Sequence, residues 1–159
     1  MMNNKRIASE LNRVAKSLVS SGEVANTAGK YKNFTGTIKW QGSRGEVRNA
    51  IFELDRHGIV WEDGIWEKGL WEYGIWESGT WHGGTWEYGT WKSGVWEKGT
   101  WEYGTWWDGM WKDGVWKDGT WWDGVWKDGV WKDGVWKNGR WERGKDNHYV
   151  ERTDSPDNW

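Results

Sequence analysis

The chain of 159 residues has no cysteine and a single proline. Without cysteine, neither a disulfide framework nor a thiolate metal site can form. No apolar run reaches the roughly 18 residues that a membrane-spanning helix needs, and the first residues lack the apolar block of a secretory signal. We therefore expect a cytoplasmic or virion protein with no membrane span and no signal-directed secretion.

Tryptophan and glycine are abundant instead, with 21 and 24 residues. Residues 61–145 repeat a five-residue unit, Trp-x-x-Gly-x, 17 times without a break, and 13 of the fifth positions are Ile, Thr or Val. A period of five does not fit a helix, and each glycine would cost a helix about 1 kcal/mol. β-branched residues beside aromatics favour extended backbone, so the repeat predicts short β segments joined by corners.

These segments are too short for a meander, because hairpins every five residues would leave strands of about three residues. A β-solenoid pairs each short segment with the equivalent segment one turn away, at a spacing of about 4.8 Å. We therefore predict an all-β protein with a β-solenoid over residues 61–145, of roughly four to six turns.

The repeat also predicts which side chains lie inside. So many exposed indoles would leave a very large apolar surface, so we place the repeat tryptophans in the interior, with glycine making room beside them. The two variable positions are mostly polar and belong at the outer corners. The predicted core consists of Trp61, Trp66, Trp71, Trp76, Trp81, Trp86, Trp91, Trp96, Trp101, Trp106, Trp111, Trp116, Trp121, Trp126, Trp131, Trp136 and Trp141.

Written as Gly-Thr/Val-Trp-x-x, the unit resembles that of the pentapeptide-repeat family of β-solenoids. The resemblance covers about half of the chain, with glycine in place of the usual alanine and tryptophan in place of leucine or phenylalanine. It implies a right-handed, four-sided coil with about twenty residues per turn. Some family members mimic DNA and bind topoisomerase, but the charge balance of this repeat fits that role poorly. The longer MORN repeat is a weaker match.

A second period in the sequence favours a different turn. Tyr73, Tyr88 and Tyr103 recur at intervals of 15 residues, as do Trp107 and Trp122. A three-sided coil would stack these residues into ladders. Gene duplication need not follow the geometric turn, so we favour four sides and keep three as the alternative.

The flanking segments suggest caps and appendages. Residues 1–22 have the apolar spacing of an amphipathic helix and resemble the short leaders of tailed-phage proteins, which implies a particle component. Residues 23–60 are less regular and suit a cap or early turns, and residues 146–159 form a polar tail. An uncovered solenoid end exposes unpaired strand edges, which leaves homo-oligomerisation through an end open.

Candidate chemistry is sparse. The three histidines have no paired motif, the repeated Asp positions are mostly preceded by lysine, which disfavours calcium, and the Thr positions are too often interrupted for ice binding. We predict no enzyme, no cofactor and no metal. Basic residues are spread over residues 1–60 and the repeat is nearly balanced, so nucleic acid is not the expected partner. Amphipathic rings on a surface often contact partners, so the candidate binding residues are Tyr73, Tyr88, Tyr103, Trp107 and Trp122.

These observations predict a non-enzymatic structural or interaction protein. In this interpretation a rigid repeat scaffold presents an outer face to a protein partner, for example in a phage particle. The alternative is a module that binds a glycan or another stacking ligand through the five outward aromatics.

Overall fold

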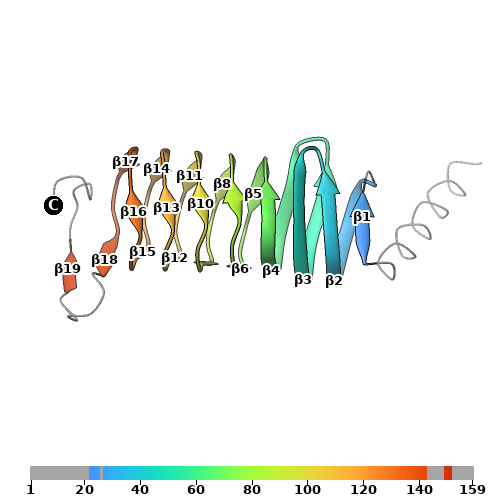
Figure 1. Ribbon diagram of the computed structural model, residues 1–159, viewed down its shortest axis with the longest axis horizontal. Helices are drawn as coiled ribbons and strands as arrows, with labels where there is room; N and C mark the ends of the chain where they lie inside the picture. The colour runs from blue at the N-terminus through green and yellow to red at the C-terminus, as the bar shows by residue number, and fades with distance from the viewer. Residues whose placement is uncertain (1–21, 26, 143–148, 152–159) are drawn as a thin grey trace, which may run out of the picture.

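The computed structural model describes residues 22–25, 27–142 and 149–151. They form one 19-stranded sheet that coils into an elongated rod, a β-solenoid of about eight turns (Figure 1). The described ranges contain no helix, and therefore none long and apolar enough to cross a bilayer. The predicted all-β solenoid is confirmed, whereas the predicted helix over residues 1–22 lies almost wholly outside the described residues.

The strands fall into a long set and a short set. At the N-terminal end are β1 (Glu23–Ala25), β2 (Gly29–Trp40), β3 (Ser43–Asp55) and β4 (Gly58–Trp71). The short strands are β5 (Gly74–Trp76), β6 (Thr80–Trp81), β7 (Thr85–Trp86), β8 (Thr90–Trp91), β9 (Val95–Trp96), β10 (Thr100–Trp101), β11 (Thr105–Trp106), β12 (Met110–Trp111), β13 (Val115–Trp116), β14 (Thr120–Trp121), β15 (Val125–Trp126), β16 (Val130–Trp131), β17 (Val135–Trp136), β18 (Arg140–Glu142) and β19 (Tyr149–Glu151).

The register of the short strands fixes the turn at 15 residues. Parallel pairing joins Thr80 to Val95 and Thr100 to Val115, so each strand pairs with the third strand after it. The coil therefore has three sides, and the favoured expectation of four sides and twenty residues per turn is wrong. The three indoles of each turn meet edge to face and fill a triangular interior. They leave no empty volume inside the coil that would call for a fourth side.

The repeat tryptophans build the interior, as predicted. From Trp61 to Trp126 every one is fully buried, and Trp136 is buried as well. Trp131 and Trp141, near the C-terminal end of the rod, are only partly buried. Each indole stacks on the indole one turn away, as in Trp96 on Trp111 with ring centroids 4.8 Å apart and planes 7° from parallel. It also meets the next indole along the chain edge to face, as in Trp96 and Trp101 at 5.9 Å and 71°. Both geometries are favourable for aromatic pairs, so three continuous columns of rings run along the rod.

Backbone hydrogen bonds hold successive turns together. In each unit two amide groups donate to the turn below, for example Glu97 N to Trp81 O at 2.8 Å and Val95 N to Gly79 O at 2.9 Å. The indole N–H groups contribute much less: those from Trp61 to Trp111 have no hydrogen-bond partner among the described residues. Ring packing, rather than hydrogen bonding by the indoles, therefore stabilises the interior.

The long N-terminal strands differ from the short strands β5 to β17 in pairing antiparallel. β3 runs antiparallel to both β2 and β4, and β4 alone covers three sides, because it pairs with β5, β6 and β7 in turn. Register shifts interrupt both antiparallel pairings. A two-residue turn with positive φ at Gln41 and Gly42 joins β2 to β3, as hairpins require. The described part of residues 23–60, expected to be an irregular cap or early turns, thus consists mainly of long strands that follow the short β1.

Apolar side chains from these long strands continue the indole interior. Phe52 stacks on Trp61 with centroids 6.0 Å apart, and Tyr31 stacks on Phe52 at 5.0 Å. Burial raises the pKa of the Tyr31 phenol, whose hydroxyl donates a hydrogen bond to Thr27 O at 2.7 Å. The N-terminal strands therefore cover the first indoles of the rod and act as a cap.

Candidate functional site

The two variable positions of each unit lie at the three corners of the rod, and the 15-residue turn stacks them into columns. We name each corner after a residue in it. The Tyr corner holds the residues after Trp71, Trp86, Trp101, Trp116 and Trp131. The Trp corner holds those after Trp61, Trp76, Trp91, Trp106, Trp121 and Trp136. The His corner holds those after Trp66, Trp81, Trp96, Trp111 and Trp126, together with Glu142.

The Tyr corner brings three of the five predicted site residues together. Tyr73, Tyr88 and Tyr103 are 49%, 47% and 49% exposed. Their rings stack with centroid distances of 5.6 and 5.5 Å and nearly parallel planes. Because each ring covers the face of its neighbour, the ladder presents mainly ring edges and hydroxyl groups to solvent.

The other two predicted residues lie on a different corner. Trp107 and Trp122 stack at 5.0 Å on the Trp corner and are 46% and 40% exposed. The ammonium of Lys137 lies 5.8 Å from the ring of Trp122, within the range of a cation–π contact. The five aromatics therefore form two separate ladders rather than one surface.

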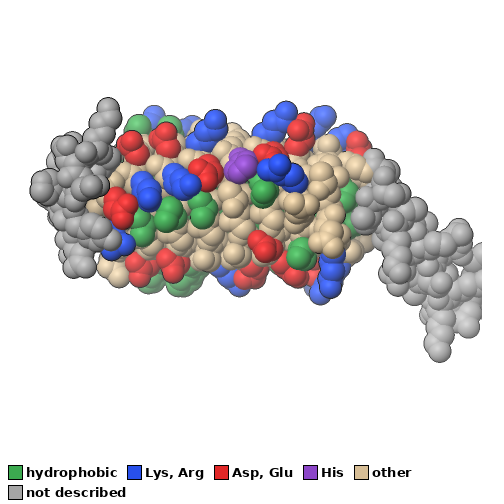
Figure 2. Space-filling model, turned by 90° about the horizontal axis from the view of Figure 1, so that it is seen from below, with side chains coloured by type: hydrophobic (Ala, Val, Ile, Leu, Met, Phe, Trp, Pro, Cys, Tyr) green, Lys and Arg blue, Asp and Glu red, His purple; other side chains and the backbone are tan. Residues whose placement is uncertain are grey.

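Charged side chains pair along the same columns. Lys92 bonds to Glu77, Lys112 to Glu97 and Lys117 to Glu102, each at 2.9 Å and each across one turn. Figure 2 shows acidic and basic side chains following one another along the rod. These groups are all partly exposed, so each pair contributes at most about 1 kcal/mol. Their main effect is to neutralise these charges locally.

The repeated aspartates make local turn contacts. In seven units the Asp Oδ1 accepts a hydrogen bond from the N–H of the following glycine, as in Asp108 to Gly109 and Asp133 to Gly134, at 2.6 to 2.8 Å. This arrangement accounts for the frequent Asp-Gly pairs. No group of three or more possible metal-binding His, Asp or Glu side chains occurs in the described ranges.

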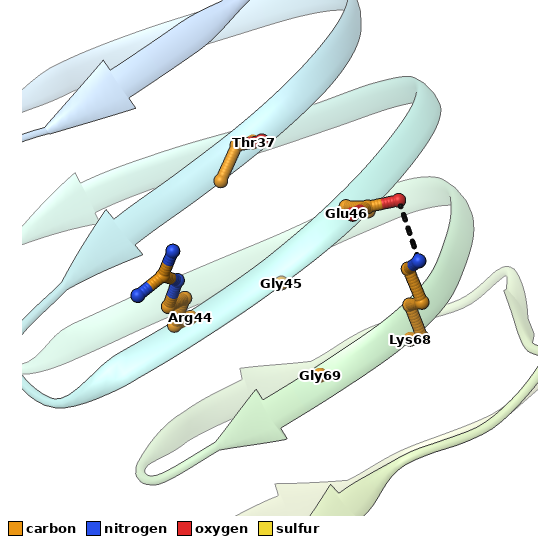
Figure 3. Close-up of a pocket in the computed structure, with 6 residues that line it drawn as sticks. All are labelled: Thr37, Arg44, Gly45, Glu46, Lys68 and Gly69. Carbon is orange, nitrogen blue, oxygen red and sulfur yellow. Dashed lines mark ion pairs between the residues drawn. The ribbon is translucent and has the colours of Figure 1, made fainter.

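Two open hollows lie between side chains on the surface. One, of about 260 Å³, is lined by Thr37, Arg44, Gly45, Glu46, Lys68 and Gly69 of β2, β3 and β4 (Figure 3). Across it Lys68 pairs with Glu46 at 3.3 Å. The other, of about 520 Å³, lies on the His corner, where His82 Nδ1 is 2.7 Å from Glu67 Oε2. Both hollows are shallow and lined largely by charged side chains.

Sequence reasoning identified the five aromatics that are exposed in the described part of the chain, but it missed contacts between residues on the corners. The cation–π contact of Lys137 and the pairing of His82 with Glu67 depend on which residues share a column. The 15-residue recurrence in the sequence was the signal for both contacts, because residues 15 apart are neighbours in a three-sided coil.

Comparison with known proteins gives no relative from which a function could be transferred. No family model, no curated protein and no solved structure matches the chain. The chain shares with pentapeptide repeats a β-solenoid built from a five-residue unit. Its turn of 15 residues differs from the turn of about twenty residues that the resemblance implies.

Proposed function

We propose that this protein is a non-enzymatic structural and interaction protein. It forms a rigid rod, and one outer corner of the rod presents side chains at regular spacing to a protein partner. The observation that carries the proposal is the unbroken stacking of buried indoles from Trp61 to Trp126. A close-packed interior of large rings resists bending, because any bend would separate stacked faces. A phage particle is one setting that would use such a spacer.

Glycan binding through the outward aromatics has less support. A sugar packs against the face of an aromatic ring, and within both ladders the inner faces are covered by neighbouring rings at 5.0 to 5.6 Å. Lys137 lies over the ring of Trp122 as well. The ladders are better suited to lateral contacts along their edges, which favours an extended protein partner over a small stacking ligand.

Spin-label distances test the rigid rod. Asp63 and Asn138 lie in one column, five turns apart, so labels on Asp63→Cys and Asn138→Cys are separated along the axis by roughly 24 Å at about 4.8 Å per turn. The absence of native cysteine makes labelling specific. We expect one narrow distance distribution in a pulsed dipolar measurement.

The matched control moves one label by one turn. With Ser78→Cys in place of Asp63→Cys the distribution is expected to stay narrow and to shorten by about 5 Å. Broad distributions for both pairs, or no shift between them, would show that the rod is not rigid and would contradict the proposed function.

A further inference from the structure

We propose that the Tyr corner binds a basic α-helix of a partner protein that carries one Arg or Lys per turn. The proposal rests on the proposed function and names the chemistry of the partner. It concerns the part of the corner in which the sequence Glu-Tyr occurs three times in register, at residues 72–73, 87–88 and 102–103.

Two of the three glutamates in these Glu-Tyr pairs lack the ion pairs that other glutamates on the rod form, whereas the third, Glu102, pairs with Lys117. Glu77, Glu97 and Glu102 each pair with a lysine one turn further along. Glu72 and Glu87 are followed in their column by another glutamate, and neither forms an ion pair with any described residue. Both are exposed. Like charges directly opposite one another on neighbouring strands repel, so a cationic partner would relieve this repulsion.

The spacing of the tyrosine rings favours an α-helical partner over an extended one. The tyrosine centroids are 5.6 and 5.5 Å apart, and an α-helix advances about 5.4 Å per turn. Successive turns of the rod lie about 4.8 Å apart along the axis, so a helix lying along the corner would drift by only about 1 Å over the three Glu-Tyr pairs. An extended strand advances about 6.6 Å for every second residue, so it would drift by about 4 Å over the same pairs.

The exposed groups also suit arginine. At each step a carboxylate and a phenol oxygen come from adjacent residues, and both accept hydrogen bonds. A guanidinium offers several donors in a planar fork and can bond to more than one acceptor. The Trp corner differs, because Lys92 and Lys137 stand before and after its two indoles. The Trp corner has no Glu-Tyr pair, so the same partner is expected to bind there more weakly, which gives an internal control.

Titration calorimetry with two synthetic peptides tests the proposal. Both are alanine-based helices of one composition: the first carries one Arg per turn on a single face, and the second distributes the same Arg residues around the helix. We expect the intact protein to bind the first peptide about tenfold more tightly than the second, equivalent to about 1.4 kcal/mol. Equal affinity for both, or no binding, would overturn the proposal.

Variants of the Tyr corner test whether the first peptide binds there. Changing all three tyrosines to Ser uses a residue that the repeat already has at this position, in Ser78 and Ser93. This variant, and separately Glu72→Gln with Glu87→Gln, are each expected to weaken binding of the first peptide about tenfold. The control variant, Trp107→Ser with Trp122→Ser, is expected to keep the wild-type affinity.

The outcomes separate this inference from the proposed function. If the Tyr-corner variants bind as tightly as the control, or if an extended peptide with Arg at alternate positions binds better than the helix, the inference fails. The scaffold proposal survives those results as long as the spin-label distances remain narrow. The glutamine variant alters only exposed side chains, so it keeps the test decisive even if the tyrosine variant does not fold.

Discussion

Replacing Gly109 by Ala is expected to destabilise the rod by about 3 kcal/mol or more. The φ angle of Gly109 is 123°, in a region that side-chain-bearing residues rarely adopt. A Cβ there would lie 2.5 Å from Gly94 O and 3.0 Å from Gly94 N, so the backbone of the turn below would have to shift. Urea unfolding followed by far-UV circular dichroism measures the loss.

The chain contains a matched control for this change. Gly83 occupies a variable corner position and is not one of the repeat glycines. A Cβ at Gly83 would meet no atom closer than 3.9 Å. Gly83→Ala is therefore expected to change the unfolding free energy by no more than about 0.5 kcal/mol. Equal losses in the two variants would contradict the tight packing between successive repeat glycines.

Removing one central indole should have a similarly large effect. Trp96 is fully buried and stacks on Trp81 and Trp111 at 4.9 and 4.8 Å. It also meets Trp91 and Trp101 edge to face. Trp96→Ala would leave a cavity in a rigid column, so the unfolding free energy should fall by about 3 to 5 kcal/mol. Chemical denaturation measures this difference.

Trp107→Ala is the corresponding control, because Trp107 is 46% exposed and Trp122 is its single ring partner among the described residues. Its expected cost is about 1 kcal/mol, within the range measured for a single aromatic pair. A larger loss for Trp107 than for Trp96 would mean that the exposed ladders, rather than the interior indoles, hold the rod together. Hydrogen exchange would show whether each loss stays confined to adjacent turns, as expected for a repeat structure.

The sequence predicted which side chains face the interior of the rod, but it did not predict the number of sides of the coil. Burying seventeen indoles was the only arrangement compatible with a polar corner at every unit, and the structure has Trp61 to Trp126 inside. The period of five was compatible with several turn lengths. The size of the indole decides among them, because three rings in edge-to-face contact fill the interior. The 15-residue recurrence of Tyr73, Tyr88 and Tyr103 pointed to this result.

The N-terminal cap was harder to predict. Residues 29–55 have no repeat, and their pairing depends on contacts between distant residues such as Tyr31 and Phe52. One local signal was the Gln41-Gly42 pair, which forms the turn between β2 and β3. For the candidate site, the sequence predicted exposure of all five aromatics. Their division into two ladders became evident only with the three-sided register.

Fluorescence quenching tests the central claim, that the indoles form the interior of the rod. The measurement uses the variant Trp107→Ser with Trp122→Ser, which removes the two exposed, stacked indoles. Native protein is expected to emit in the blue with little quenching by acrylamide, and denatured protein to emit in the red with full access to the quencher. Red, readily quenched emission from the native variant would show that the repeat tryptophans face solvent and would contradict the account.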